Sequence, residues 1–176
     1  MPATQEISEC LVRENITRAI ADVFQTMLGK AARLSPTAIP ALGASWPPRP
    51  TEGVNTPQLV GTVGFLGELN GLIYIYFPLE FARSCTAQLL GMSDTELHAA
   101  GDEVVYDAIG ELTNMSVGSF KNGLCDAGYP CMLTIPSILR GANFCVEPIS
   151  SAQRYTYCFE LGDCKVVTDI LVKAAD

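Results

Sequence analysis

Apolar residues recur every three or four positions along three stretches of the chain, which is the period of an amphipathic α-helix. The pattern predicts helices over residues 7–28, 79–91 and 102–124. Gly29 directly follows the first stretch, and glycine readily takes the left-handed conformation that ends a helix. The sequence SDTE at 93–96 has the residue types of a capping box and predicts a further helical turn before the long third helix.

Shorter runs rich in β-branched and aromatic residues predict strands. The first lies over residues 59–77 and contains Asn70 and Gly71, a dipeptide suited to a tight turn, so we expect a β-hairpin folded at these two residues. Four prolines between 44 and 58 predict a loop or an extended segment before it. The runs after the third helix predict strands at 131–139, 143–149, 154–161 and 165–172.

Two parts of the chain resemble each other. Glu14 in the first predicted helix is followed by Pro40 in the segment TAIPAL, and Glu111 in the third helix is followed at nearly the same distance by Pro136 in LTIPSI. Each part then continues into hairpin-like β sequence. We therefore expect one α/β (α+β) domain over all 176 residues, in which two pseudo-symmetric helix–strand–hairpin halves share a β-sheet and the long helices pack on it. The expected halves span about 5–100 and 101–176.

The composition is that of a globular protein with a sizeable core. Of the 176 residues, 48% are apolar and 17% are charged, and the net charge is −8. No basic cluster is present that could neutralise phosphates, so we expect no binding to nucleic acid or to an anionic membrane. No apolar stretch reaches the roughly 18–20 residues of a membrane span, and the N-terminus lacks the basic start and apolar segment of a signal peptide. We expect a cytoplasmic protein.

The residues that commonly bind metal ions are scattered along the sequence. The seven cysteines include no Cys-x-x-Cys pair, and the single histidine, His98, has no cysteine near it. We interpret the cysteines as small reduced core residues, with a disulfide or metal set as the alternative, and His98 as a surface residue. We therefore expect the chain to have no metal or cofactor of its own.

Asp107, Glu111, Asn114 and Gly118 follow one another in the third helix at spacings of four, three and four residues. On a helical wheel these four positions, the polar stripe, fall within about 60° of one another and away from the apolar face. A mid-helix glycine costs about 1 kcal/mol relative to alanine, and asparagine is a poor helix former. The polar stripe is therefore either ordinary solvated surface or a small chemical device. The apolar face predicted to be buried comprises Val105, Ala108, Ile109, Leu112, Ser116, Ser119 and Phe120.

The chemistry of the stripe favours a site that is completed by a partner. A carboxamide can both donate to and accept from a water molecule, and can so orient it for attack. A carboxylate one turn away can hold a cationic group or take up proton density from that water. Because the sequence shows no metal site, Ser/Cys–His pair or cofactor loop beside them, Glu111 and Asn114 would complete another molecule's active site better than they would form one alone.

The pattern Asp107-x3-Glu111-x2-Asn114-x21-Pro136 resembles the signature of the CheC/CheX/FliY family of response-regulator phosphatases. The flanking segments VFQTMLG and VGFLGELNGLIYIYFP also resemble the CheX branch. The resemblance implies hydrolysis of the aspartyl phosphate of a CheY-like receiver domain, in chemotaxis or a related two-component pathway. Asn114 would then orient the attacking water, and Glu111 would pair with the receiver's lysine. Asp107 and Pro136 would support the helix and the adjoining strand.

The same resemblance implies that Mg²⁺ is supplied by the phosphorylated receiver and that the chain forms a homodimer. The first predicted helix carries Cys10, Glu14 and Thr17 at the positions of the acid, acid and amide of the third helix. A threonine hydroxyl is shorter than an asparagine side chain and lacks the planar amide, so we expect one working site per chain. The alternatives are a noncatalytic receiver-binding adaptor and a structural protein with an accidental stripe.

Overall fold

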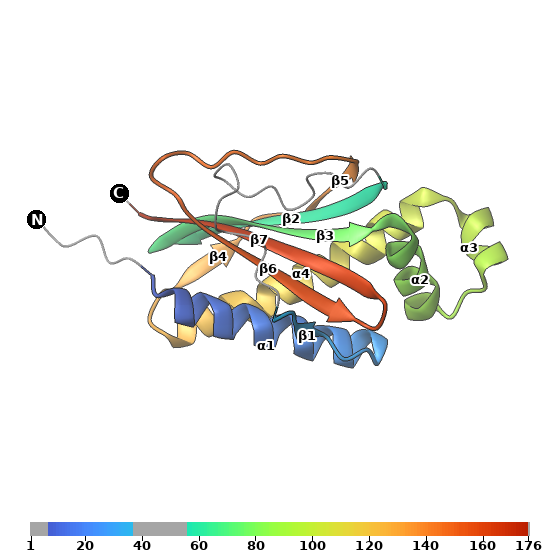
Figure 1. Ribbon diagram of the computed structural model, residues 1–176, viewed down its shortest axis with the longest axis horizontal. Helices are drawn as coiled ribbons and strands as arrows, with labels where there is room; N and C mark the ends of the chain where they lie inside the picture. Colours follow the sequence, from blue (N-terminus) through green and yellow to red (C-terminus); the bar gives the residue numbers. More distant parts are fainter. Residues whose placement is uncertain (1–6, 37–55, 176) are drawn as a thin grey trace, which may run out of the picture.

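The computed structural model describes residues 7–36 and 56–175 of the chain. Within these residues, one antiparallel β-sheet carries two long helices, α1 (Glu9–Leu28) and α4 (Asp102–Asp126), on one face (Figure 1). This arrangement confirms the predicted mixture of long helices and a shared sheet. The remaining elements are β1 (Arg33–Leu34), β2 (Gln58–Gly67), β3 (Leu69–Pro78), α2 (Leu79–Leu90), α3 (Asp94–Ala100), β4 (Cys131–Leu133), β5 (Ser137–Gly141), β6 (Gln153–Leu161) and β7 (Cys164–Ala174).

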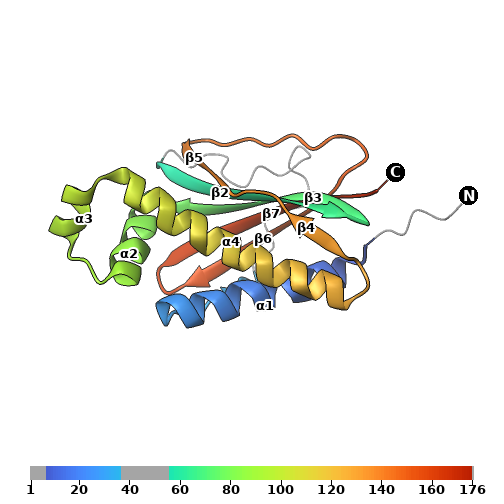
Figure 2. The same ribbon diagram turned by 180° about the vertical axis from the view of Figure 1, so that it is seen from behind.

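The helices begin and end close to the residues that the sequence predicts. α1 is followed by Gly29 in the left-handed conformation with φ 60°, and α2 is followed by Gly91 with φ 64°. α3 begins with a complete capping box, in which Ser93 and Glu96 each accept a hydrogen bond from the other's backbone N–H. α2 and α3 lie together at one end of the sheet (Figures 1 and 2).

The strand order is β1-β6-β7-β3-β2-β4, with β5 also beside β2, and neighbouring strands run antiparallel. The β2–β3 and β6–β7 hairpins meet in the middle of the sheet, where β3 pairs with β7 and Ile73 lies opposite Ile170. Each expected half therefore contributes one hairpin, and the two hairpins are joined through β3 and β7. The equivalence of the two halves stays a prediction.

The prediction that the first hairpin folds at Asn70 and Gly71 is wrong. Phe65 pairs with Gly71, so the turn is centred on Glu68 and both residues of the dipeptide lie within β3. Asn70 still contributes to the turn, because its side-chain oxygen accepts a hydrogen bond from a backbone N–H there at 3.2 Å. A Cβ atom at Gly71 would lie 2.2 Å from Phe65 Cζ and 2.4 Å from the carbonyl oxygen of Leu171. Close packing within the sheet, and not a tight turn, therefore requires this glycine.

The predicted strand at 143–149 is also wrong, since an irregular segment over 142–152 connects β5 to β6. Asn143 has a φ of 55°, which interrupts an extended chain. The segment runs along the side of the sheet away from the two long helices (Figures 1 and 2). Arg154 holds it there by donating to one of its backbone carbonyls at 3.1 Å, while the same guanidinium forms a two-pronged ion pair with the buried carboxylate of Asp169.

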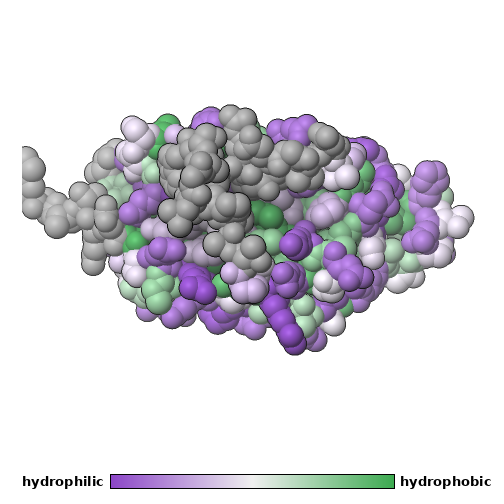
Figure 3. All heavy atoms as spheres, in the orientation of Figure 1, coloured by the Kyte–Doolittle hydropathy of each residue, from purple (hydrophilic) through white to green (hydrophobic). Residues whose placement is uncertain are grey.

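The core lies between the long helices and the sheet. Phe24 of α1 stacks on Phe77 of β3 with ring centroids 6.2 Å apart, and Phe120 of α4 meets Phe65 of β2 edge-on at 6.1 Å. The outer side of α1 is mostly hydrophilic along the lower margin of the molecule (Figure 3), as expected for an amphipathic helix. Both long helices are therefore fixed on the same face of the sheet by their apolar sides.

Most of the predicted proline-rich loop, residues 44–55, lies outside the described residues. Among the helices that the structure describes, none has both the length and the apolar character needed to cross a membrane.

Candidate functional site

Helix α4 turns one side to the sheet and presents the polar stripe on another. Asp107 and Glu111 are exposed, and Asn114 is half-buried, so the stripe lies outside the core as its spacing predicts. Two residues predicted to be buried, Ala108 and Ser119, are only half-buried, because they lie at the border of the contact with the sheet and α1. The buried residues of α4 are Val105, Ile109, Leu112, Thr113, Ser116, Val117, Phe120, Gly123 and Leu124.

Thr113, the residue before Asn114, packs α4 onto strand β2. A Cβ atom at Gly61 would lie 2.0 Å from Thr113 Oγ1, so the helix packs directly against the strand backbone. Thr113 and Ser116 each donate a hydrogen bond to the backbone carbonyl four residues earlier, at 2.7 and 2.8 Å. Both hydroxyl donors are therefore satisfied, and Asn114 is presented from a helix with little freedom to shift.

An ion-pair network fixes the N-terminal end of α4. Asp102 accepts hydrogen bonds from Arg83 of α2 at 2.5 Å and from Arg140 of β5 at 2.6 Å, and Arg140 also donates to the Tyr106 hydroxyl at 3.0 Å. The hydrogen bond from Arg140, together with the charges of both guanidinium groups, lowers the pKa of the Asp102 carboxyl. This network is not visible in the sequence, because the two arginines are 19 and 38 residues away from the aspartate.

The carboxylate of Glu111 and the carboxamide of Asn114 are available to another molecule. Within the described part of the chain, neither group makes a hydrogen bond, and neither is closed off from solvent. α4 contains five acidic residues and a single basic one, Lys121, which lies beyond the stripe. The exposed side of the helix therefore combines a negative charge with a short group that can both donate and accept hydrogen bonds.

Pro136 lies between β4 and β5, where the edge of the sheet is interrupted, and both of these strands contact α4. The pairing register shifts by one residue between β4 and β5, so residues 134–136 oppose only two residues of β2. Thr134 and Gly64 hold this bulge together through two hydrogen bonds of 2.8 Å. Proline has no N–H to leave unpaired in such a bulge, and the neighbouring Ile135 is 88% exposed.

The corresponding residues of α1 are Cys10, Glu14 and Thr17, and their environment differs from that of the polar stripe. The Cys10 thiol donates to a carboxylate oxygen of Glu14 at 3.3 Å. Thr17 Oγ1 is buried and has no hydrogen-bond partner among the described residues. Tyr157 of β6 lies close to this stretch of α1, where burial first and the charge of Glu9 second raise the pKa of its hydroxyl.

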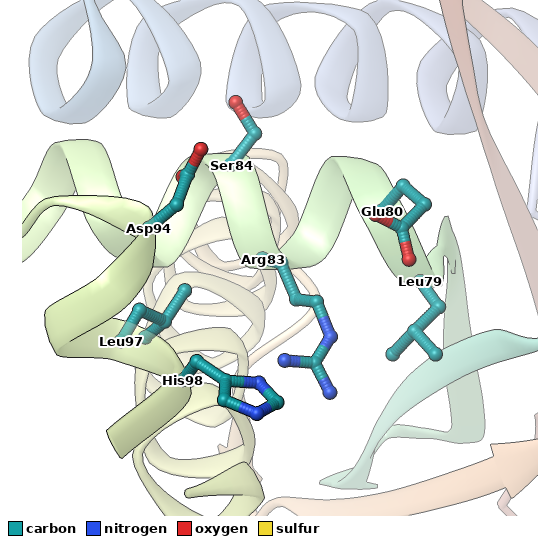
Figure 4. Close-up of a pocket in the computed structure, with 7 residues that line it drawn as sticks. All are labelled: Leu79, Glu80, Arg83, Ser84, Asp94, Leu97 and His98. Carbon is teal, nitrogen blue, oxygen red and sulfur yellow. The ribbon is translucent and has the colours of Figure 1, made fainter. Parts of the chain in front are cut away.

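A hollow between α2 and α3 contains the single histidine (Figure 4). His98 and Arg83 both point into it, and Arg83 is already paired with Asp102. Glu80 and Asp94 also line the hollow, so it mixes charges of both signs. Ser84 also lines the hollow, but among the described residues no hydrogen bond joins its hydroxyl to His98 or to either acidic residue, and His98 is exposed, as the sequence predicts.

The cysteines are less buried than predicted. Cys85 and Cys131 are buried, and burial raises the pKa of the Cys85 thiol to about 12, but Cys10 and Cys145 are exposed. The interpretation of all seven as core residues is therefore wrong. No disulfide bond joins them, and across residues 7–36 and 56–175 no three His, Cys, Asp or Glu side chains are grouped so that they could hold a metal ion.

Solved structures with the same arrangement of helices and sheet define the structural class. The chemotaxis protein CheX of Vibrio vulnificus matches with a TM-score of 0.74 and 17% identity, over 96% of this chain and 100% of that one. A CheC-like superfamily protein of Shewanella sp. PV-4 matches with a TM-score of 0.72 and 21% identity, over 95% and 100%. A chain of the CheX–CheY–BeF3–Mg²⁺ complex of Borrelia burgdorferi matches with a TM-score of 0.62 and 18% identity, over 92% and 97%. The protein therefore has a CheC/CheX-like fold.

The family follows from the sequence itself. The model of the family described as "Chemotaxis phosphatase CheX" matches residues 59–160, which is more than half of the chain and includes both the polar stripe and Pro136. The chain belongs to the CheX family. No curated protein matches it.

Proposed function

We propose that the chain is a phosphatase that hydrolyses the aspartyl phosphate of a CheY-like receiver domain in chemotaxis. The observation that carries the proposal is the pair of exposed Glu111 and half-buried Asn114, neither hydrogen-bonded within the described residues, on a helix that is fixed at both its N-terminal end and its middle. Membership of the CheX family supports the activity, and the structural likeness to a chain of a CheX–CheY complex supports the partner.

Asn114 would position the attacking water. Its carboxamide oxygen accepts a hydrogen bond from the water, and its NH₂ group can donate to the water or to a phosphoryl oxygen. The water oxygen then forms a bond to phosphorus in line with the bond that breaks, between phosphorus and the receiver's aspartate. The products are a free aspartate carboxylate on the receiver and inorganic phosphate, which takes the oxygen and both protons of the water and can release one proton to solvent.

Glu111 would orient the two proteins. It lies one turn before Asn114 on the same side of α4 and has no partner within the described chain, so it can pair with a cationic side chain of the receiver. Because a fixed ion pair next to the water-positioning amide determines where the amide points, we assign Glu111 to docking and Asn114 to the chemistry. Asp107 and Pro136 are proposed to support α4 and the adjoining edge strands.

The magnesium ion of the reaction would be held by the receiver, where it neutralises the charge of the phosphoryl oxygens. This chain's own acidic residues do not suit a metal, because the exposed carboxylates of the polar stripe are single groups spaced along a helix. We expect the purified protein to contain no stoichiometric metal by elemental analysis, while the phosphatase assay with the receiver requires Mg²⁺.

We also propose that the protein is a homodimer with twice the chain mass of 18.9 kDa. In the described residues the outer edge of β4 and β5 is unpaired, and Met132 and Ile135 on it are 76% and 88% exposed. Exposed apolar edge strands are commonly covered by another chain. Sedimentation velocity at micromolar concentration tests this, and a strict monomer would remove the dimer from the proposal.

The function itself is tested by release of inorganic phosphate from phosphorylated receiver domains of the same organism, assayed one at a time with and without the protein. Accelerated release from at least one receiver is expected, and it should be absent with Asn114→Ala. A protein that binds a phosphorylated receiver without accelerating release would instead be the noncatalytic adaptor.

A further inference from the structure

Helix α4 contains three glycines in its interior, and packing against the described residues explains only one of them. A Cβ atom at Gly123 would lie 2.0 Å from Asn15 Oδ1, so this glycine lets α1 and α4 touch. At Gly110 a Cβ atom would meet only Ile138 Cγ1 at 4.0 Å, an ordinary contact, and at Gly118 it would meet no described atom within 4 Å. Because glycine weakens a helix interior, two glycines without a packing reason indicate a role outside this chain.

The two unexplained glycines lie on either side of the proposed catalytic amide. Gly110 is four residues before Asn114 and Gly118 is four residues after it, so all three share one side of the helix. The neighbours of Asn114 three residues away are Glu111, which belongs to the polar stripe, and Val117, which is buried. Asn114 therefore stands between two turns of bare backbone.

Bare turns matter because an asparagine side chain is short. The Cα atoms of a helix lie about 2.3 Å from its axis, and average side chains bring the full diameter to about 10–12 Å. Full-length side chains one turn before and after Asn114 would project at least as far as its amide. They would hold a partner's surface away from the amide, whereas glycines let that surface approach the helix backbone.

The other long helix lacks this feature. Thr17 of α1, which occupies the position of Asn114, has Arg13 four residues before it and Ala21 four residues after it. Arg13 is exposed, and its long side chain can cover the turn that Gly110 leaves bare on α4. Bare turns thus accompany the amide of α4, whose hydrogen-bonding groups are available, and not the buried hydroxyl of α1.

We infer that Gly110 and Gly118 are positioning residues that let the receiver's backbone close onto α4, so that Asn114 reaches a phosphoryl group recessed below the receiver surface. The inference rests on the proposed phosphatase function and specifies its substrate. The substrate is a phosphoryl-aspartate in a shallow recess of a protein whose rim contacts the turns at Gly110 and Gly118. Side chains at these two positions restrict that approach in proportion to their size.

The test is a size series at one position. Gly118→Ala and Gly118→Leu are compared with the parent and with Ser119→Ala, a matched change at the next residue, which points away from the polar stripe. Three quantities are measured: the thermal midpoint of each free protein, kcat/KM for phosphate release from a phosphorylated CheY-like receiver, and Kd for the same receiver activated with beryllofluoride. Gly110→Ala serves as an independent repeat on the other side of Asn114.

Gly118→Ala is expected to raise the thermal midpoint, because alanine favours the helix and its methyl group meets no described atom within 4 Å. The same change should lower kcat/KM about tenfold and leucine about 100-fold, since small misplacements of reacting groups have effects of that order. Kd should rise in the same order, which means weaker binding to the receiver. Ser119→Ala should leave both binding and turnover unchanged.

Opposite signs for stability and activity separate this role from a structural one. Parent activity retained by a folded Gly118→Leu variant overturns the inference and leaves the proposed phosphatase in place. A Gly118→Ala variant that is both less stable and less active also overturns it, because the glycine is then needed by the fold. A parent protein that accelerates release from no receiver overturns the proposed function itself, and this inference with it.

Discussion

Helices α1 and α4 lie on the same face of the same sheet and carry a glutamate at matching positions, Glu14 and Glu111, yet the groups beside these two glutamates differ. Glu111 and Asn114 make no hydrogen bond within the described chain. On α1, Glu14 accepts a hydrogen bond from Cys10, and the Thr17 hydroxyl is buried. Spacing along a helix thus creates a stripe, whereas reactivity toward a partner depends on whether the surrounding chain leaves that stripe unbonded and open.

Cys10 of α1 forms a hydrogen bond to Glu14 that an ionised Asp107 on α4 cannot form to Glu111. The hydrogen bond from the Cys10 thiol to Glu14, together with the negative charge of that carboxylate, raises the pKa of the thiol. The two groups therefore stabilise each other in the protonated-thiol form, with the thiol occupying a carboxylate oxygen that could otherwise accept from a partner. Asp107, at the position of Cys10, cannot donate such a bond when it is ionised, so Glu111 keeps its full capacity.

The parts of the sheet that lie beside the two helices also differ in structure. Beside α1, the tyrosines of β6 pack close to the helix, and the Tyr155 hydroxyl donates to the backbone carbonyl of Ile7 at 3.1 Å. Beside α4, the edge is interrupted by the bulge at residues 134–136. A bulge re-aims side chains and ends regular pairing, and here it leaves Ile135 exposed at the edge strands that contact α4.

The largest expected effect comes from substituting Asn114 of α4, compared with Thr17 at the matching position of α1. Asn114→Ala should reduce phosphate release from the receiver by at least about 100-fold, because it removes the group that orients the water. Thr17→Ala should leave the rate close to that of the parent. Circular dichroism and thermal unfolding provide the control, because the Asn114 side chain lies outside the core. Wild-type turnover by a folded Asn114→Ala protein would make Asn114 a structural residue.

Substitutions of the two matching glutamates, Glu111 and Glu14, should differ less in their effects on affinity and turnover. Glu111→Gln keeps the shape of the side chain but removes the charge meant for a cationic partner, so receiver affinity and turnover should both fall by about tenfold. The matched change Glu14→Gln should affect neither quantity. Raising the salt concentration should reduce the difference between parent and Glu111→Gln, because screening weakens an exposed ion pair. Equal effects of the two substitutions would contradict the assignment of docking to α4 alone.

The contact between the two helices should be sensitive to a single methyl group. Gly123→Ala would place a Cβ atom 2.0 Å from Asn15 Oδ1 and 2.5 Å from an Arg18 guanidinium nitrogen, so these side chains of α1 or the helix itself must shift. Overpacking of this kind costs about 1–3 kcal/mol, and for a domain of this size about 1 kcal/mol lowers the thermal midpoint by about 2–4 °C. Gly118→Ala is the matched control in the same helix and should not lower it. A neutral Gly123→Ala would show that the contact adapts.

The smallest expected effect concerns the N-terminal end of α4, which has an ion-pair network where α1 has no side-chain cap. The pKa of Asp102 is lowered in the folded state, so its contribution to stability is present above the ordinary aspartate pKa and is lost as pH falls through the lowered value. Asp102→Asn should therefore unfold at a slightly lower temperature than the parent at pH 7, and the difference should disappear as the pH falls through the lowered pKa of Asp102. A difference that persists in acid would assign the effect to the hydrogen bonds alone.

Much of the fold could be predicted because its helices are specified locally. The period of the apolar residues, the glycines after α1 and α2 and the capping box before α3 all act within a few residues of one another. The same locality made the polar stripe visible, since residues three and four apart share a side of any helix. The assignments that failed were those that depend on distant partners: the register of the first hairpin, which the sheet and Phe65 decide, and the segment 143–149, which Arg154 ties across the back of the sheet.

The order of the residues is enough to place an acid, an acid, an amide and a glycine on one side of a long helix, and a similar but altered set on another. Which of the two sets is open depends on the folded chain. Arg83 and Arg140 meet at Asp102, Thr113 seats on Gly61, and a bulge ends regular pairing at the sheet edge. These contacts join residues far apart in the chain, and their strength depends on burial and on distances of a few ångströms, which no local pattern of residue types contains.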